Sequence, residues 1–217
     1  SPMAVAQAKT QPTLHAAPFS LPAKQLFDVV HAAKGNKKAP GEMVLVDELV
    51  EFDASGRKTR QRRMLSRLNL ESAVDSWGQV EASYTPGRHR PTTIRARVVN
   101  EDGSENWLDD KTLSTSKNSG NVGRGIYAER HTIGGPLPSI RAHSVVEELH
   151  TTVDDDPFVV GAGDFSVFPA SRTALFSRLR VRHPTSVPVR VRVVGDGFSV
   201  KKTVRDGWVE QEFVRKL

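Results

Sequence analysis

The sequence predicts an all-β protein, an antiparallel β-sandwich of about ten strands with one short N-terminal helix. Three observations support this fold class. Hydrophobic residues recur with a period of two from Gly41 onward, turn-forming residues interrupt the chain at fairly regular intervals, and a single earlier stretch has helical spacing. With 217 residues, of which 37% are hydrophobic, the chain is long enough to bury a core without disulfides.

The N-terminal region divides into a leader and a helix. Residues 1–19, SPMAVAQAKTQPTLHAAPF, have no period and are expected to form a flexible leader, of which the opening Ser-Pro-Met resembles a cloning remnant. In residues 20–36, Leu26, Phe27 and Val30 recur at helical spacing. Ser20 is expected to cap this helix, and Gly35 is expected to end it in the left-handed conformation.

Residues 41–217 are expected to form the β-domain. The first two strands, at 44–52 and 57–68, are joined by Asp-Ala-Ser-Gly-Arg, in which Gly56 suits a left-handed corner. Residues 113–125 are rich in Ser, Gly and Asn and are expected to form a mobile loop. Further strands are expected at 77–84, 92–100, 144–153, 165–168, 174–182, 187–194, 198–204 and 207–214.

The most conspicuous stretch is SRLRVRHPTSVPVRVRVV at 177–194, in which arginines alternate with Leu and Val. Alternation of this kind is typical of a strand with one buried face and one solvated arginine face. The net charge of +6 and the pI near 9.8 leave open a polyanion-binding domain. The possible polyanion contacts are Arg60, Arg62, Arg63, Arg178, Arg180, Arg182, Arg190 and Arg192. Aromatic residues make up only 6% of the chain, so a nucleic-acid partner is not expected.

Two carboxylates lie among hydrophobic strand residues and are the candidates for catalysis. A buried Glu147 or Glu48 could serve as a general acid, which leaves open a stand-alone hydrolase-type enzyme. Such a carboxylate more often pairs with an inward-facing arginine or with backbone donors, and glycosidase chemistry needs a second carboxylate at a set distance. We therefore expect no catalytic residue.

No metal or cofactor site is expected. The acidic run at 154–156, with His150 and Asp164, could gather around calcium, but its spacing fits no EF-hand loop and an exposed acidic turn is the simpler interpretation. The chain has no cysteine, and its histidines lack zinc-site spacing. The glycine-rich 120–125 lacks the Lys-Ser/Thr end of a phosphate loop. The three tryptophans are expected to fill the core.

Three passages resemble a bacterial family of unknown function whose domain precedes a transglutaminase-like core in envelope and secreted proteins. They are VLVDELVEFDASGRKTRQRRMLSRL, IRARVVNEDGSENW, and the pair LPSIRAHSVVEELHTTVD and SRTALFSRLRVRHPTSVPVRVRV. The resemblance implies an accessory β-domain and a periplasmic, envelope or secreted location. Peptidase or acyl-transfer activity would belong to the core, whose cysteine this chain lacks.

The sequence therefore favours a non-catalytic binding or positioning module of a larger protein. Its expected partners are protein, peptide or glycan surfaces and an adjacent domain. No apolar run of about 18 residues is present, so no membrane-spanning helix is expected, and the N-terminus lacks the features of a signal peptide.

Overall fold

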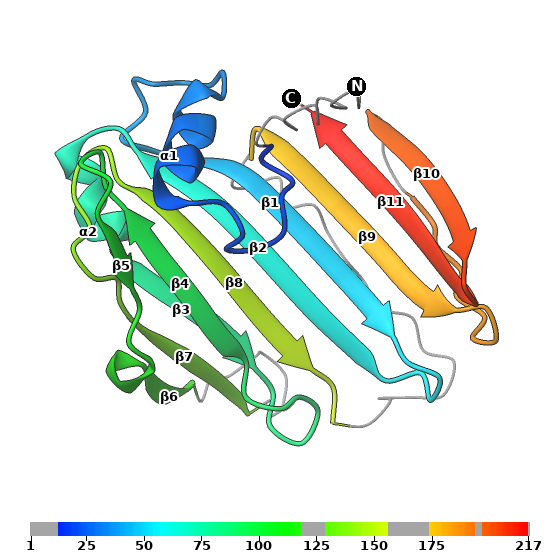
Figure 1. Ribbon diagram of the computed structural model, residues 1–217. Coiled ribbons are helices and arrows are strands. Elements are labelled where there is room, and N and C mark those ends of the chain that lie inside the picture. Colours follow the sequence, from blue (N-terminus) through cyan, green and yellow to red (C-terminus); the bar gives the residue numbers. More distant parts are fainter. Residues whose placement is uncertain (1–12, 119–128, 156–173, 194–196, 217) are drawn as a thin grey trace, which may run out of the picture.

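The computed structural model describes residues 13–118, 129–155, 174–193 and 197–216 (Figure 1). Within them the chain is mostly β, with eleven strands in two sheets and two short α-helices. The expected strand at 165–168 and the glycine-rich 120–125 lie outside the described residues. The prediction is confirmed as far as a mostly β protein.

The larger sheet contains eight strands. Their spatial order is β10 (Phe198–Arg205), β11 (Trp208–Lys216), β9 (Phe176–Pro184), β1 (Gly41–Phe52), β2 (Lys58–Leu68), β8 (Val145–Val153), β4 (Thr93–Val99) and β5 (Glu105–Trp107). The smaller sheet has the order β3 (Gln79–Tyr84), β7 (Arg130–Pro136) and β6 (Ser114–Asn118). The helices are α1 (Ala23–Ala32) and α2 (Val74–Trp77), with 3-10 turns at Glu71–Ala73 and Asp110–Thr112.

The pairing corrects the expected antiparallel β-sandwich. The two sheets are open and unequal in size, and β1 pairs with β9 in parallel, so the larger sheet is mixed. The smaller sheet packs on one end of the larger one, where Ile94, Ala96 and Val98 of β4 share a core with Val80 and Ile133. Side-chain alternation shows which face of a strand is buried, but it carries no information on strand order.

Helix α1 covers the opposite face of the larger sheet (Figure 1). Leu26 and Val30 are fully buried there against Val44, Leu65 and Val145, which confirms the helix expected at this point of the chain. Its ends differ from the expectation. The Ser20 hydroxyl donates to the Ala17 carbonyl and makes no cap, and the helix ends at Ala33 in an extended conformation without a left-handed Gly35. Among the described residues no helix is long and apolar enough to cross a membrane.

The first hairpin follows the sequence prediction closely. Gly56 has a φ of 81°, in the left-handed region that suits glycine, and Asp53 accepts hydrogen bonds from the backbone of Ser55 and Arg57. The strands expected at 77–84, 92–100, 144–153, 174–182, 198–204 and 207–214 form as β3, β4, β8, β9, β10 and β11, with ends that differ by two residues at most. The remaining described strands were not predicted correctly. β5, β6 and β7 were missed, since β6 falls in the Ser/Asn-rich stretch, and residues 187–193 form no strand, although they alternate.

Candidate functional site

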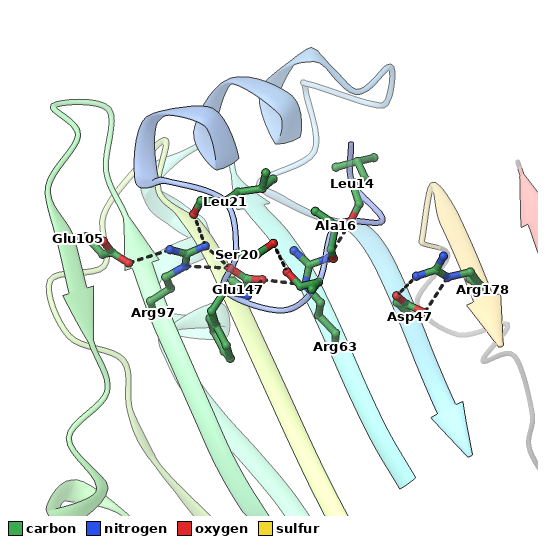
Figure 2. A network of polar contacts seen from close by, with 12 residues as sticks. Leu14, Ala16, Ser20, Leu21, Asp47, Arg63, Arg97, Glu105, Glu147 and Arg178 are labelled. Carbon is green, nitrogen blue, oxygen red and sulfur yellow. Dashed lines mark hydrogen bonds and ion pairs between the residues drawn. The ribbon is translucent and has the colours of Figure 1, made fainter. Parts of the chain in front are cut away.

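Glu147 lies at the centre of a buried network on the face that α1 covers (Figure 2). Its side chain has no exposed surface, and in β8 it stands between Leu65 of β2 and Arg97 of β4. Arg63 Nε donates to Oε1 at 2.7 Å, and Arg97 Nε and Nη2 donate to Oε2 at 2.8 and 2.6 Å. The backbone N–H of Phe19 adds a fourth donor to Oε1 at 2.9 Å.

The charges of this network are balanced. Arg97 also binds Glu105 through Nη1 at 2.8 Å, so two guanidinium groups face two carboxylates. A carboxylate can be buried only when it is paired and hydrogen-bonded, and here both oxygens of Glu147 are occupied. The expectation that Glu147 partners inward-facing arginines and backbone donors is confirmed.

The same arginines hold the segment that precedes α1, residues 13–21, which we call the N-terminal strap. Arg63 Nη1 donates to the carbonyls of Leu14 and Ala16 at 2.7 and 2.8 Å, and Arg97 Nη2 donates to that of Leu21 at 2.9 Å (Figure 2). The described end of the expected leader is therefore bound to the sheet through its backbone. These carbonyls would otherwise lack partners, because the strap forms no regular secondary structure.

The strap also presents an aromatic side chain. Phe19 has a φ of 60°, which is unusual for a residue with a Cβ, and its ring lies 5.1 Å from that of Trp107. Arg95 lies over Phe19, 4.8 Å from the ring centroid. Trp107 is 45% exposed and lines, with Arg95, an open hollow of about 490 Å³. The prediction of a core position was wrong for this tryptophan, since it lies on the short edge strand β5.

A third buried arginine, Arg67, lies at the end of α1. Arg67 Nη1 donates to the carbonyls of Val30 and Ala33 at 3.0 and 2.9 Å, and Nη2 binds Glu42 Oε2 at 2.6 Å. The last carbonyls of a helix lack intrahelical partners and carry partial negative charge, so a guanidinium group there satisfies and stabilises them. Neither this role nor that of Arg97 was predicted. The alternation in TTIRARVVN places Arg97 on one face of β4, but only the pairing with β8 brings it to Glu147.

The arginines of β9 pair with acidic residues of β1. Arg178 and Asp47 stand opposite each other in the parallel pair; Arg178 Nε donates to Oδ1 at 2.9 Å, and Nη2 binds Oδ2 (Figure 2). Arg180 Nη2 is 3.6 Å from the same carboxylate. Arg182 binds Glu51 at 3.1 Å and lies over the ring of Trp208, 4.4 Å from its centroid. Thus the arginines of β9 lie on one face of the strand as expected. Carboxylates of the same chain pair with them.

The eight arginines considered as polyanion contacts do not form one patch. Arg63 is buried, and it shares its sheet face with Arg178, Arg180 and Arg182. Register places Arg60 and Arg62 on the opposite face, where Arg60 Nε is 2.8 Å from Glu48. The last two, Arg190 and Arg192, are exposed and lie outside any strand.

The two candidate catalytic carboxylates lie on opposite faces of the sheet. Glu147 stands opposite Leu65, and Glu48 stands opposite Arg62, three residues earlier in β2. Successive side chains of a strand alternate between faces, so the two carboxylates cannot act on one substrate.

The acidic turn after β8 is also paired. Asp154 lies 3.6 Å from His89 and 3.9 Å from Lys58, and Asp155 binds Arg90 at 3.3 Å. His150 does not join this turn; its Nε2 is 3.0 Å from Glu148. The described residues contain no group of three or more potential metal ligands, and Asp156 and Asp164 lie outside them.

Comparison with known protein families identifies the family of this chain. Residues 54–214 match the model of DUF3857, a domain of unknown function with a solved structure. The chain belongs to the DUF3857 family. The match begins in the turn after β1 and includes β2 to β10 and most of β11, and it agrees with the resemblance seen in the sequence as far as a domain of unknown function. No curated protein matches this DUF3857 chain in sequence.

Solved structures show where the fold recurs. The DUF3857 chain resembles the crystal structure of "a putative protease" from Parabacteroides distasonis, with a TM-score of 0.71 and 13% identity over 82% of this chain and 35% of that one. At this identity the likeness shows the fold alone. An M1 zinc metallopeptidase from Deinococcus radiodurans matches 82% of this chain and 40% of its own, at 10% identity and a TM-score of only 0.35. The DUF3857 chain thus spans about a third of the first of these proteins.

Proposed function

We propose that this chain is a non-catalytic binding or positioning module of a larger bacterial protein. The observation that carries the proposal is the state of Glu147. This candidate catalytic carboxylate is fully enclosed, and four donors from Arg63, Arg97 and Phe19 occupy both of its oxygens. A general acid or nucleophile needs a free oxygen in contact with substrate.

The arrangement of the arginines favours a module that does not bind polyanions. A polyanion site needs cationic groups that are exposed and unpaired, so that phosphates or sulfates can displace their counterions. The arginines of β9 are instead engaged by Asp47 and Glu51, and those of β2 are divided between two faces.

The larger protein is inferred from coverage and from the family resemblance. The chain spans 35% of the Parabacteroides protein that shares its fold. The resemblance to domains that precede a transglutaminase-like core suggests such a core as the neighbour, with a periplasmic, envelope or secreted location. In this arrangement the module presents surfaces to a protein, peptide or glycan and leaves the chemistry to the core.

The test compares activity with and without the two carboxylates. The purified chain should hydrolyse no peptide, ester or glycoside substrate, and Glu147→Gln and Glu48→Gln variants should match it. Turnover that disappears in a folded Glu147→Gln or Glu48→Gln variant would establish a stand-alone enzyme and end the proposal. The gene's reading frame should also encode a catalytic domain, and deleting the module from that protein should raise KM for macromolecular substrates and leave small-substrate turnover unchanged.

A further inference from the structure

The edge strand β10 is almost entirely exposed. Seven of its eight residues are exposed, and within the described residues it pairs only with β11. The opposite edge of the sheet is β5, which has only three residues. A long edge strand offers a row of backbone N–H and C=O groups to an added strand, whereas a three-residue edge offers few.

Apolar side chains are exposed on this strand as well. Val200 and Val204 are 58% and 61% exposed, the highest values among the large hydrophobic residues that are exposed in the described chain. They are two of the four side chains that alternate onto one face of β10, and an added strand would cover them from the side. Solvated edge strands do not require valine at these positions.

The charge on β10 has one sign. Lys201, Lys202 and Arg205 are exposed, and the strand has no acidic residue. Neither lysine forms an ion pair with a described carboxylate, and Arg205 pairs only with the neighbouring Asp206, at 3.0 Å. Glu212 of β11 stands opposite Lys201 in the strand pair, and its carboxylate lies 3.6 Å from Arg178.

We propose that β10 is a docking edge for an extended, acidic segment of a partner polypeptide, which adds to the sheet as a further strand. This inference rests on the proposed binding function and names the partner's chemistry. Backbone hydrogen bonds would supply the pairing, and contacts with Val200 and Val204 on one face would bury apolar surface. A carboxylate opposite Lys201 on the other face would select the partner, with Lys202 adding to the positive charge of the edge.

A second copy of the chain is a poor occupant of this edge. Two β10 strands that pair antiparallel through the same free edge are related by a two-fold axis, so a central residue stands opposite its own copy. A pair centred on the middle of β10 therefore sets Lys201 opposite Lys201 or Lys202 opposite Lys202. Like charges directly opposite each other destabilise a strand pair. The lysines therefore disfavour self-association through β10, whereas they would attract an acidic strand.

The experiment uses the whole chain and a labelled peptide of about ten residues with alternating valine and glutamate, the length of a strand. Peptide binding is followed by fluorescence anisotropy, and the site by amide hydrogen exchange. The test variant is Lys201→Glu/Lys202→Glu. Lys37→Glu/Lys38→Glu is the matched control, because Lys37 and Lys38 are also consecutive and exposed and the charge change is identical. A valine-lysine peptide serves as the second probe.

We expect the glutamate peptide to protect the amides of β10. Its affinity should fall at least about tenfold in the Lys201/Lys202 variant and stay the same in the control, while the lysine peptide should prefer the Lys201/Lys202 variant. Protection elsewhere, an equal loss in both variants, or self-association of the unmodified chain through β10 would overturn the inference. If the chain has no enzymatic activity, each of these three results would overturn the docking edge and leave the proposed function intact. Turnover that depends on Glu147 would refute the proposed function but would not test the docking edge.

Discussion

Arg63 and Arg97 bind different oxygens of one carboxylate from two strands that do not pair with each other. Arg63 reaches Glu147 from β2 and Arg97 reaches it from β4, with β8 between them. Each arginine also holds a carbonyl of the N-terminal strap. One buried carboxylate thus joins three strands and the segment before α1, and its removal should loosen all of them.

Glu147→Gln should lower the free energy of unfolding by about 3–5 kcal/mol, because it leaves the buried guanidinium group of Arg63 without its anion and leaves Arg97 with Glu105 alone. Chemical denaturation at pH 7 measures this change. Glu48→Gln is the matched control, since the Glu48 side chain is 15% exposed and pairs with the more exposed Arg60; its cost should stay within about 1 kcal/mol. Equal costs for the two variants would contradict the central role of Glu147.

Arg67→Lys should weaken the end of α1. A lysine keeps the charge but cannot bind Glu42 and the carbonyls of Val30 and Ala33 together, so we expect a loss of about 1–3 kcal/mol. Amide exchange in α1 should accelerate more than exchange in β11. Lys24→Ala, which removes only an exposed pair with Asp28, should leave both rates within experimental error of the unmodified chain.

Gly56→Ala should cost about 1–2 kcal/mol, the price of a left-handed conformation for a residue with a Cβ. No atom lies within 4 Å of the added Cβ, so the cost is conformational and not steric. Gly56→Asn should therefore recover part of the loss, because asparagine tolerates this region. Thermal denaturation of the two variants distinguishes the cases, and a larger loss for Asn than for Ala would refute the conformational explanation.

The local sequence pattern predicted which side chains share a face of a strand. The pairing of strands that are distant in the sequence determined the polar contacts of the buried network. The alternation at 178–182 correctly placed the arginines on one face of β9, opposite Leu179 and Val181. It could not show that β9 pairs with β1 in parallel, or that Asp47 of β1 binds Arg178. The same alternation at 187–193 predicted a strand that does not form, since period alone supplies no partner for the backbone.

The strap was missed for a different physical reason. Its attachment runs through the carbonyls of Leu14, Ala16 and Leu21, and backbone carbonyls are the same whatever the side chains are. Composition therefore suggested a leader without structure. The useful signal lay in β2 and β4, where arginines occupy positions of a strand that hydrophobic residues would ordinarily fill.

Acidification should loosen the strap through His15. Burial, with a further contribution from Arg178, lowers the pKa of His15 below its ordinary value of 6.5, and burial likewise lowers the pKa of His31. The unfolded chain then binds more protons than the folded chain once the pH falls below 6.5, so stability should decline from there, by at most about 1.4 kcal/mol per pH unit for each histidine.

The window from pH 7 to pH 5 isolates this effect. Asp53 has a pKa lowered from 3.8 by the Ser55 hydroxyl and by backbone donors, so its contribution is lost only at lower pH, as the carboxylate becomes protonated. The charges that act on His15 come from Arg178, Arg63, Asp47 and Glu212. Denaturation across the window should show a decline in the unmodified chain that is smaller in His15→Gln and smallest in a His15→Gln/His31→Gln double variant. Amide exchange in residues 13–21 should rise as the pH falls, after correction for intrinsic rates, and an unchanged slope in the double variant would show that other groups drive the acid response.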